Sequence, residues 1–134
     1  MRSLSIVPPV MLSACALAQD PVRSDSDKYT VVQENDRVRV LRYHDKPGER
    51  TSMHAHPDLV LYAVSPFRRR LTFEDGKTRE LEFKAGDVVL LPGQKHIGEN
   101  IGSTDTEVLI VELREPRPIA APNVGVTTSP ATEP

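Results

Sequence analysis

Three histidines have the residue type and spacing of metal ligands. His54 and His56 stand one residue apart, and His96 follows much later in the chain. In an extended strand alternate side chains share a face, so the imidazoles of His54 and His56 point the same way. A pair from one strand and a single histidine from another can surround one ion. Because neutral imidazole is a good ligand for such ions, the pattern predicts a mononuclear site for a divalent transition metal, namely Fe, Mn, Ni, Zn or Cu.

No acidic side chain clearly joins this set. Asp58 shares the parity of His56, but His56-Pro57-Asp58 is typical of a turn, which makes Asp58 a poor candidate ligand. Glu99 has the opposite parity to His96 and is expected to face away. The fourth histidine, His44, precedes the Pro47-Gly48 turn and is expected in a loop. Three neutral histidines leave the charge of a divalent ion uncompensated, which favours an anionic organic ligand.

Tyr62 and Asn100 are the other candidates for a binding pocket. If the strand is regular, Tyr62 lies on the face of His54 and His56, where its hydroxyl would orient a substrate. The alternative for Tyr62 is a core tyrosine at the rim. Asn100 shares the parity of His96, so it either contacts the ligand or stabilises the neighbouring turn. The alternative for the histidines themselves is a pocket that binds no metal and selects a small ligand by shape.

The elements around these residues are predicted to be short strands. Runs with period-two alternation, or continuous apolar runs, are separated by turns that contain glycine or Asn-Asp pairs. Strands are expected at 29–33, 37–43, 59–64, 68–73, 78–83, 88–91, 96–100 and 106–113. The runs 59–64 and 88–91 are apolar throughout, which predicts burial on both sides. No stretch has a convincing helical period, so the fold class is all-β, a sandwich or barrel.

Two motifs in this region resemble those of small cupins. In each motif a glycine is followed by five residues and then by the characteristic ones: Gly48 by five residues and His54, and Gly86 by five residues and Pro92. The members present here are Gly48, His54 and His56 in the first motif, and Gly86, Pro92, Gly93, His96 and Asn100 in the second. The chain departs from the family pattern in two places. Val60 stands where the first motif has a glutamate, and one residue fewer separates Pro92 from His96.

The resemblance implies a small single-domain cupin β-barrel of the jelly-roll type, spanning 28–114. It also implies His54, His56 and His96 as metal ligands, and a homodimer whose plausible edge is the hairpin 29–43. Cupins include dioxygenases, isomerases, decarboxylases and binding proteins, so the fold does not choose the reaction. The leading hypothesis is an exported cupin whose metal binds or transforms a small anionic molecule, by oxygenation or isomerisation if it is catalytic. The alternative is a non-catalytic sensor or accessory protein, with or without metal.

The two ends of the chain differ from the middle. Residues 1–18 combine Arg2, a short apolar run and a small-x-small site before Gln19, which predicts a secretory signal peptide. The sequence ending at Cys15 also resembles a lipobox, which would attach the protein to a membrane. The protein is therefore expected outside the cytoplasm: periplasmic or in the cell envelope, lipid-anchored through Cys15, or secreted. Polar residues 19–27 predict a linker, and 115–134 a disordered, Pro-rich tail.

Composition limits the partners. At 134 residues the chain has room for one domain, and its formal net charge is −2. This balance argues against nucleic acid as a partner and leaves a small-molecule ligand. The concentrated positive run 68–70 lies within a predicted strand and is interpreted as a solvated strand face.

Overall fold

The computed structural model describes residues 19–115 of the chain. The predicted signal peptide, with Cys15, lies outside the described residues, as does the predicted tail beyond Glu115. The prediction of export and of a lipid anchor is therefore a statement about sequence alone. Within 19–115, no helix is long and apolar enough to cross a membrane.

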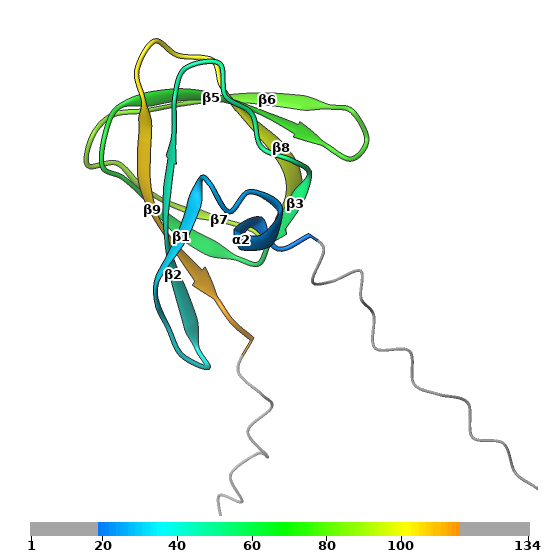
Figure 1. Cartoon of the computed structure of the whole chain (residues 1–134), viewed down its shortest axis with the longest axis vertical. Coiled ribbons are helices and arrows are strands. Elements are labelled where there is room, and N and C mark those ends of the chain that lie inside the picture. Colours follow the sequence, from blue (N-terminus) through cyan, green and yellow to red (C-terminus); the bar gives the residue numbers. More distant parts are fainter. Residues whose placement is uncertain (1–18, 116–134) are drawn as a thin grey trace, which may run out of the picture.

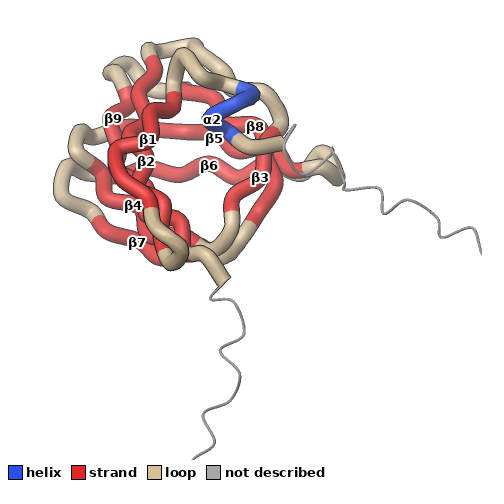
Figure 2. The backbone as a smooth tube through the Cα atoms, turned by 60° about the horizontal axis from the view of Figure 1, so that its bottom comes forward, coloured by secondary structure: helices blue, strands red, loops and turns tan. Residues whose placement is uncertain are grey.

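Within residues 19–115, nine strands form two antiparallel sheets that close into a barrel (Figures 1 and 2). The five-stranded sheet has the order β1-β2-β9-β4-β7, and the four-stranded sheet the order β3-β8-β5-β6. The bounds are β1 Tyr29–Glu34, β2 Val38–Asp45, β3 His54–His56, β4 Leu59–Ala63, β5 Phe67–Phe73, β6 Thr78–Phe83, β7 Val88–Leu91, β8 Gln94–Asn100 and β9 Thr106–Leu113. The eight predicted strands and the all-β barrel are confirmed.

The turns follow from local sequence. Asn35 joins β1 to β2, and its side-chain oxygen accepts hydrogen bonds from the backbone N–H groups of Arg37 and Val38. Gly76 between β5 and β6 has φ +80°, and Gly48 before β3 has φ +82°, as its turn position predicts. Such values are costly for residues with a Cβ. The turns at Asn35 and Gly76 close the antiparallel pairs β1–β2 and β5–β6.

The core lies between the inner faces of the two sheets. β9 pairs with β2 on one side and with β4 on the other, so the last strand holds the five-stranded sheet together. Buried apolar side chains from both sheets meet there: Tyr29, Leu41, Tyr43, Leu59, Ala63, Phe67, Val108 and Ile110. Burial of this apolar surface is the main stabilising term of the fold.

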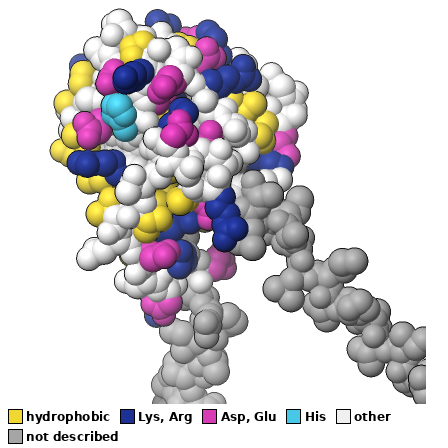
Figure 3. All heavy atoms as spheres, in the orientation of Figure 1, with side chains coloured by type: hydrophobic (Ala, Val, Ile, Leu, Met, Phe, Trp, Pro, Cys, Tyr) yellow, Lys and Arg dark blue, Asp and Glu magenta, His cyan; other side chains and the backbone are white. Residues whose placement is uncertain are grey.

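The outer face of the five-stranded sheet is exposed to solvent, and one prediction about burial is therefore wrong. The apolar runs at β4 and β7 were expected to be buried on both sides, but Val88 is 65% and Leu90 67% exposed. Nothing in the described chain covers this outer face, so only alternate residues of the two strands reach the core. Hydrophobic side chains accordingly reach the surface among charged ones in Figure 3.

Residues 19–27 were predicted to be a linker, and this is wrong. Pro21–Ser24 forms the short helix α2, with Asp20 as its N-cap. Pro21 is fully buried, and α2 lies beside β1 and β3. The carboxylates of this polar segment bind residues elsewhere in the fold. Asp20 forms an ion pair with Arg39, and Asp25 accepts a hydrogen bond from the backbone N–H of Ser52. Residues 19–27 are therefore part of the folded unit.

Candidate metal centre

The three predicted histidines meet on the inner face of the four-stranded sheet. His54 and His56 lie on β3, and His96 lies directly opposite His54 on β8. One ring nitrogen from each residue lies within 4.8 Å of the others, and all three side chains are buried. The parity argument for His54 and His56 is thus confirmed, and the β3–β8 register explains why His96 joins them.

Hydrogen bonds fix the orientation and tautomer of His54. Its Nδ1 lies 2.9 Å from the backbone carbonyl oxygen of Ser52, which can only accept, so Nδ1 carries the proton and donates. The Nε2 atom of neutral His54 is therefore an acceptor. It lies 3.2 Å from Tyr29 Oη and 3.0 Å from His56 Nε2.

His56 is fixed in the same way by a carboxylate. Its Nδ1 donates to Glu112 Oε1 at 2.7 Å, so in the neutral ring Nε2 presents a lone pair. The other oxygen of Glu112 accepts from Arg39 Nε at 2.7 Å, and Arg39 also pairs with Asp20. Burial opposes ionisation of Glu112, but its hydrogen bonds to His56 and Arg39 outweigh burial and lower its pKa. A carboxylate behind a histidine is the usual support of a metal ligand.

The facing lone pairs of neutral His54 and His56 suit a cation. Their Nε2 atoms lie 3.0 Å apart, and with both rings neutral the repulsion between the two lone pairs is relieved by a proton or a metal ion between them. His96 Nδ1 is buried and has no hydrogen-bond partner among the described residues. Two histidines bound to one ion through bonds of about 2.0–2.1 Å would place their nitrogens about 2.8–3.4 Å apart. The spacing of His54 and His56 therefore suits a divalent ion that accepts imidazole nitrogen, and the His96 nitrogen lies within 4.8 Å of both.

Two of the histidines resist protonation. Burial, with the neighbouring His56, lowers the pKa of His54 to about 4. Burial, with His54 and His56 nearby, lowers the pKa of His96 to about 2. Both rings are therefore neutral at physiological pH, which is the state that binds a metal.

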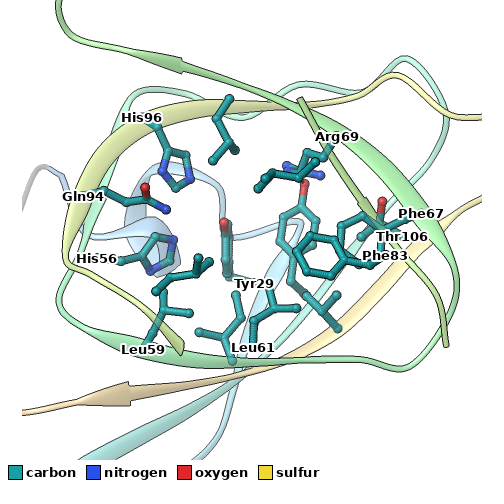
Figure 4. A pocket seen from close by; sticks show the side chains of 16 residues that line it. Tyr29, His56, Leu59, Leu61, Phe67, Arg69, Phe83, Gln94, His96 and Thr106 are labelled. Atoms are coloured by element: carbon teal, nitrogen blue, oxygen red, sulfur yellow. The ribbon is translucent and has the colours of Figure 1, made fainter. Parts of the chain in front are cut away.

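A narrow cavity runs from the histidines into the barrel (Figure 4). Its open volume is about 50 Å³, enough for one or two water molecules at about 30 Å³ each. Apolar side chains form most of its wall, and its polar lining is Tyr29, Tyr43, His56, Arg69, Gln94, His96 and Thr106. Thr106 Oγ1 is buried without a hydrogen-bond partner among the described residues. A ligand that enters without moving the wall is accordingly very small.

Arg69, the one Lys or Arg side chain in the cavity lining among residues 19–115, is already paired. Arg69 Nη1 donates to Asp45 Oδ2 at 2.8 Å, and Nη2 donates to Tyr43 Oη, which in turn donates to Asp45. Burial would lower the pKa of Arg69, but Tyr43 and Asp45 outweigh it and raise that pKa. The run 68–70 was predicted to be a solvated face. This holds for Arg68 and Arg70, which pair with Glu80 at the surface, but not for Arg69.

The pocket prediction for Tyr62 is wrong. Tyr62 is 43% exposed and lies on the outer face of β4, with Val60, whereas His54 and His56 point inward. The turn at Pro57-Asp58 breaks the alternation, since Leu59 and not Asp58 resumes the inward face. Asp58 instead accepts a hydrogen bond from the backbone N–H of Gly93.

Asn100 is buried but does not line the cavity. Its amide donates to Asp45 Oδ1 and to the carbonyl of Thr104, and its oxygen accepts from Gly102 N–H. This is the turn-stabilising role that the sequence left open. His44 lies on β2, not in a loop, and its Nε2 is 3.1 Å from Asp105 at the surface, away from the histidine cluster.

Three residues of the site were not found from the sequence: Glu112, Tyr29 and Arg69. Glu112 lies on β9, where both faces are apolar, so alternation could not show that it points inward. Arg69 did carry a signal, because it shares the parity of Phe67 and Leu71. Tyr29 opens the first strand, and nothing in its neighbourhood distinguishes a core tyrosine from one in a site.

Comparison with solved structures supports the fold. No family model matches the chain, and no curated protein matches it. Among solved structures, a cupin domain from Bordetella pertussis Tohama I is similar, with 25% identity and a TM-score of 0.60 over 65% of this chain and 92% of the other. An uncharacterised conserved protein with a double-stranded β-helix domain from Klebsiella pneumoniae shares 27% identity, with a TM-score of 0.51 over 66% of this chain and 78% of the other.

An RmlC-like cupin family protein from Methanocaldococcus jannaschii supports the fold at lower identity. It is 21% identical, with a TM-score of 0.53 over 66% of this chain and 80% of the other. The two-sheet barrel, the histidine cluster at its inner face and these structural likenesses lead to one conclusion. The chain is a small cupin-fold protein with three histidines that could hold a metal ion.

Proposed function

We propose that His54, His56 and His96 bind one divalent transition metal, which holds a small anionic organic molecule in the cavity. One observation carries the proposal: two histidine Nε2 atoms lie 3.0 Å apart while both Nδ1 protons are donated elsewhere. When bound, such an ion supplies Lewis acidity and, for Fe, Mn or Cu, redox chemistry.

The charges around the site support an anionic ligand. His54 and His96 are neutral, and Arg69 is balanced by its contact with Asp45. Glu112 shares Arg39 with Asp20, and Asp25 Oδ2 lies 3.8 Å from His54 Nδ1 on the side away from the cavity lining. Because none of these carboxylates lines the cavity, a divalent ion at the cluster would still attract an anion there. The cavity volume of about 50 Å³ restricts that anion to a few non-hydrogen atoms unless side chains move.

A binding role without turnover is the second candidate function, and the cavity lining favours it. No carboxylate lines the cavity among the described residues, so a protein general base is missing there. Turnover would then be oxygenation or isomerisation at the metal, with the side chains serving to orient the substrate and exclude water. Oxygen uptake or product formation with a panel of small carboxylates, thiols and diketones separates the two roles.

Metal analysis tests the proposal. Protein purified from cells expressing the full chain is analysed for bound metals, then titrated with Fe(II), Mn(II), Ni(II), Zn(II) and Cu(II). We expect one ion per chain, lost in His54→Ala and His96→Ala. His44→Ala is the matched control, because His44 is exposed and lies outside the cluster. A wild-type protein that binds none of the five ions would overturn the proposal.

The sequence of residues 1–18 supports a further part of the proposal, that the protein is exported. If Cys15 is lipidated, the protein is expected in the membrane fraction, and Cys15→Ser should release it. Unchanged fractionation of Cys15→Ser would contradict the anchor and leave export by a cleaved signal peptide.

A further inference from the structure

Tyr29 brings a hydroxyl to the histidine cluster from the other sheet. It is the first residue of β1 and is buried. Its Oη lies 3.2 Å from His54 Nε2, and its ring contacts His54, His56 and Tyr43. Figure 4 shows Tyr29 rising into the cavity between the histidines and Arg69. A buried tyrosine hydroxyl normally requires a hydrogen-bond partner.

The hydrogen bond from Tyr29 to His54 and metal binding by His54 exclude each other. His54 Nδ1 donates to Ser52, so Nε2 has a single lone pair, and both Tyr29 Oη and His56 Nε2 face it. Once that lone pair binds an ion, the Tyr29 hydroxyl loses its acceptor. Among the described residues the Tyr29 hydroxyl has no other side-chain hydrogen-bond partner. When His54 Nε2 binds an ion, the hydroxyl therefore needs a new partner close to that nitrogen.

The distances identify that new partner. Donor atoms bound to one ion at about 2.0–2.1 Å, at angles between octahedral and tetrahedral, lie about 2.8–3.4 Å apart. The separation of His54 Nε2 from His56 Nε2 is 3.0 Å, and its separation from Tyr29 Oη is 3.2 Å. Both fall within this range. We propose that the phenolate oxygen of Tyr29 is a fourth protein ligand of the metal.

This inference rests on the proposed function, and it specifies the charge of the small molecule that the metal would bind. As the metal–oxygen bond forms, the O–H bond of Tyr29 breaks, the oxygen keeps the electron pair and donates it to the ion, and the proton passes to solvent. Tyr29 then supplies the negative charge that the missing glutamate would have supplied. A divalent ion with three neutral histidines and one phenolate keeps one positive charge, so the remaining coordination positions favour a monoanion.

The change is easy to observe. A tyrosine hydroxyl ordinarily has a pKa of about 10 and is protonated at neutral pH, so any tyrosinate signal there reports the metal. The chain has only three tyrosines, Tyr29, Tyr43 and Tyr62, so a signal can be assigned by substitution.

Iron and zinc loading test the inference. The full-length protein loaded with Fe(III) should show a visible tyrosinate-to-iron charge-transfer band. Tyr29→Phe should abolish the band and weaken Zn(II) binding by at least about tenfold. Tyr62→Phe is the matched control, because Tyr62 is exposed on the outer face, and it should change neither the band nor the affinity. Tyr43→Phe should also keep the band.

The outcomes separate this inference from the proposed function. Metal bound by the three histidines, with no band and with equal Zn(II) affinity in Tyr29→Phe, overturns the Tyr29 inference and leaves the metal site. A wild-type protein that binds no metal overturns both. If Tyr29→Phe does not fold, a measurement on the wild-type protein alone tests whether Tyr29 binds the metal. Addition of Zn(II) should produce a near-ultraviolet tyrosinate difference spectrum, and its absence would contradict ligation.

Discussion

Glu112 Oε1 accepts a hydrogen bond of 2.7 Å from His56 Nδ1, and so places a carboxylate behind a candidate metal ligand, not beside it. The position where the first cupin motif has a glutamate holds Val60, whose side chain points to the outer face. The acid of this site therefore comes from the last strand and acts through the imidazole. It makes His56 a better electron-pair donor without occupying a coordination position.

Glu112→Gln is expected to weaken metal binding by about 10–100-fold, because the amide removes the charge that supports His56 and Arg39. Isothermal titration with Zn(II) measures the effect. Glu107→Gln is the control, since Glu107 is on the same strand but faces outward. Equal Zn(II) affinities of the wild type and Glu112→Gln would show that Glu112 has no influence on metal binding by His56.

Arg69→Met is expected to lower the free energy of unfolding by about 3–5 kcal/mol, because it leaves Asp45 buried without its cation. Adding Asp45→Asn should recover part of that loss, and urea denaturation of the four proteins gives the coupling. Arg68→Met is the matched control: its exposed pair with Glu80 should contribute less than about 1 kcal/mol. A loss in Arg69→Met no larger than in the control would contradict this account.

Gly98→Ala is expected to destabilise the protein by about 1–3 kcal/mol. A Cβ on Gly98 would lie 2.6 Å from Arg69 Nε and Nη2, and the guanidinium is held in place by Asp45 and Tyr43. At Gly102 the same addition meets its nearest atoms at an ordinary 3.4 Å, so Gly102→Ala is the control. Thermal unfolding of both variants checks the prediction. Equal melting temperatures would mean that Arg69 can move aside.

Stability of the metal-free protein is expected to fall as pH falls below about 6.5. The pKa of His54 is about 4 and that of His96 about 2 in the folded protein. In mild acid His54 and His96 are therefore protonated in the unfolded chain but remain neutral in the folded protein, so acid favours unfolding. Between pH 7 and pH 5 the loss should be about 3–4 kcal/mol.

Urea denaturation in the presence of a chelator measures this loss. His96→Gln should remove about half of the pH dependence, because one of the two suppressed protonations is gone. A free energy of unfolding that stays constant between pH 7 and pH 5 would contradict the prediction.

The sequence predicted the strands and the three histidines because both depend on local pattern. His54 and His56 share a face through alternation alone, and His96 lies in a motif whose turn sets its place. Glu112 and Tyr29 could not be predicted in this way, because their positions depend on which strands become neighbours. The register that pairs Glu112 with Arg39 and with Leu59 exists only in the assembled sheet.

Two errors have the same kind of cause. Tyr62 was placed by alternation carried through Pro57, but the turn there shifts the inward positions to Leu59 and Leu61. Residues 19–27 were read as a linker because they are polar. Their carboxylates are engaged by Arg39 and by the backbone of Ser52, which composition does not reveal.

The position of β9 between β2 and β4 has a consequence for synthesis. Tyr29 belongs to the first strand and Glu112 to the last, so the cluster gains its final support only when the C-terminal strand has paired on both sides. A chain still emerging from the ribosome would carry the histidines but not their completed surroundings. Metal uptake would then mark a finished barrel, and nascent chains would be poor competitors for scarce ions.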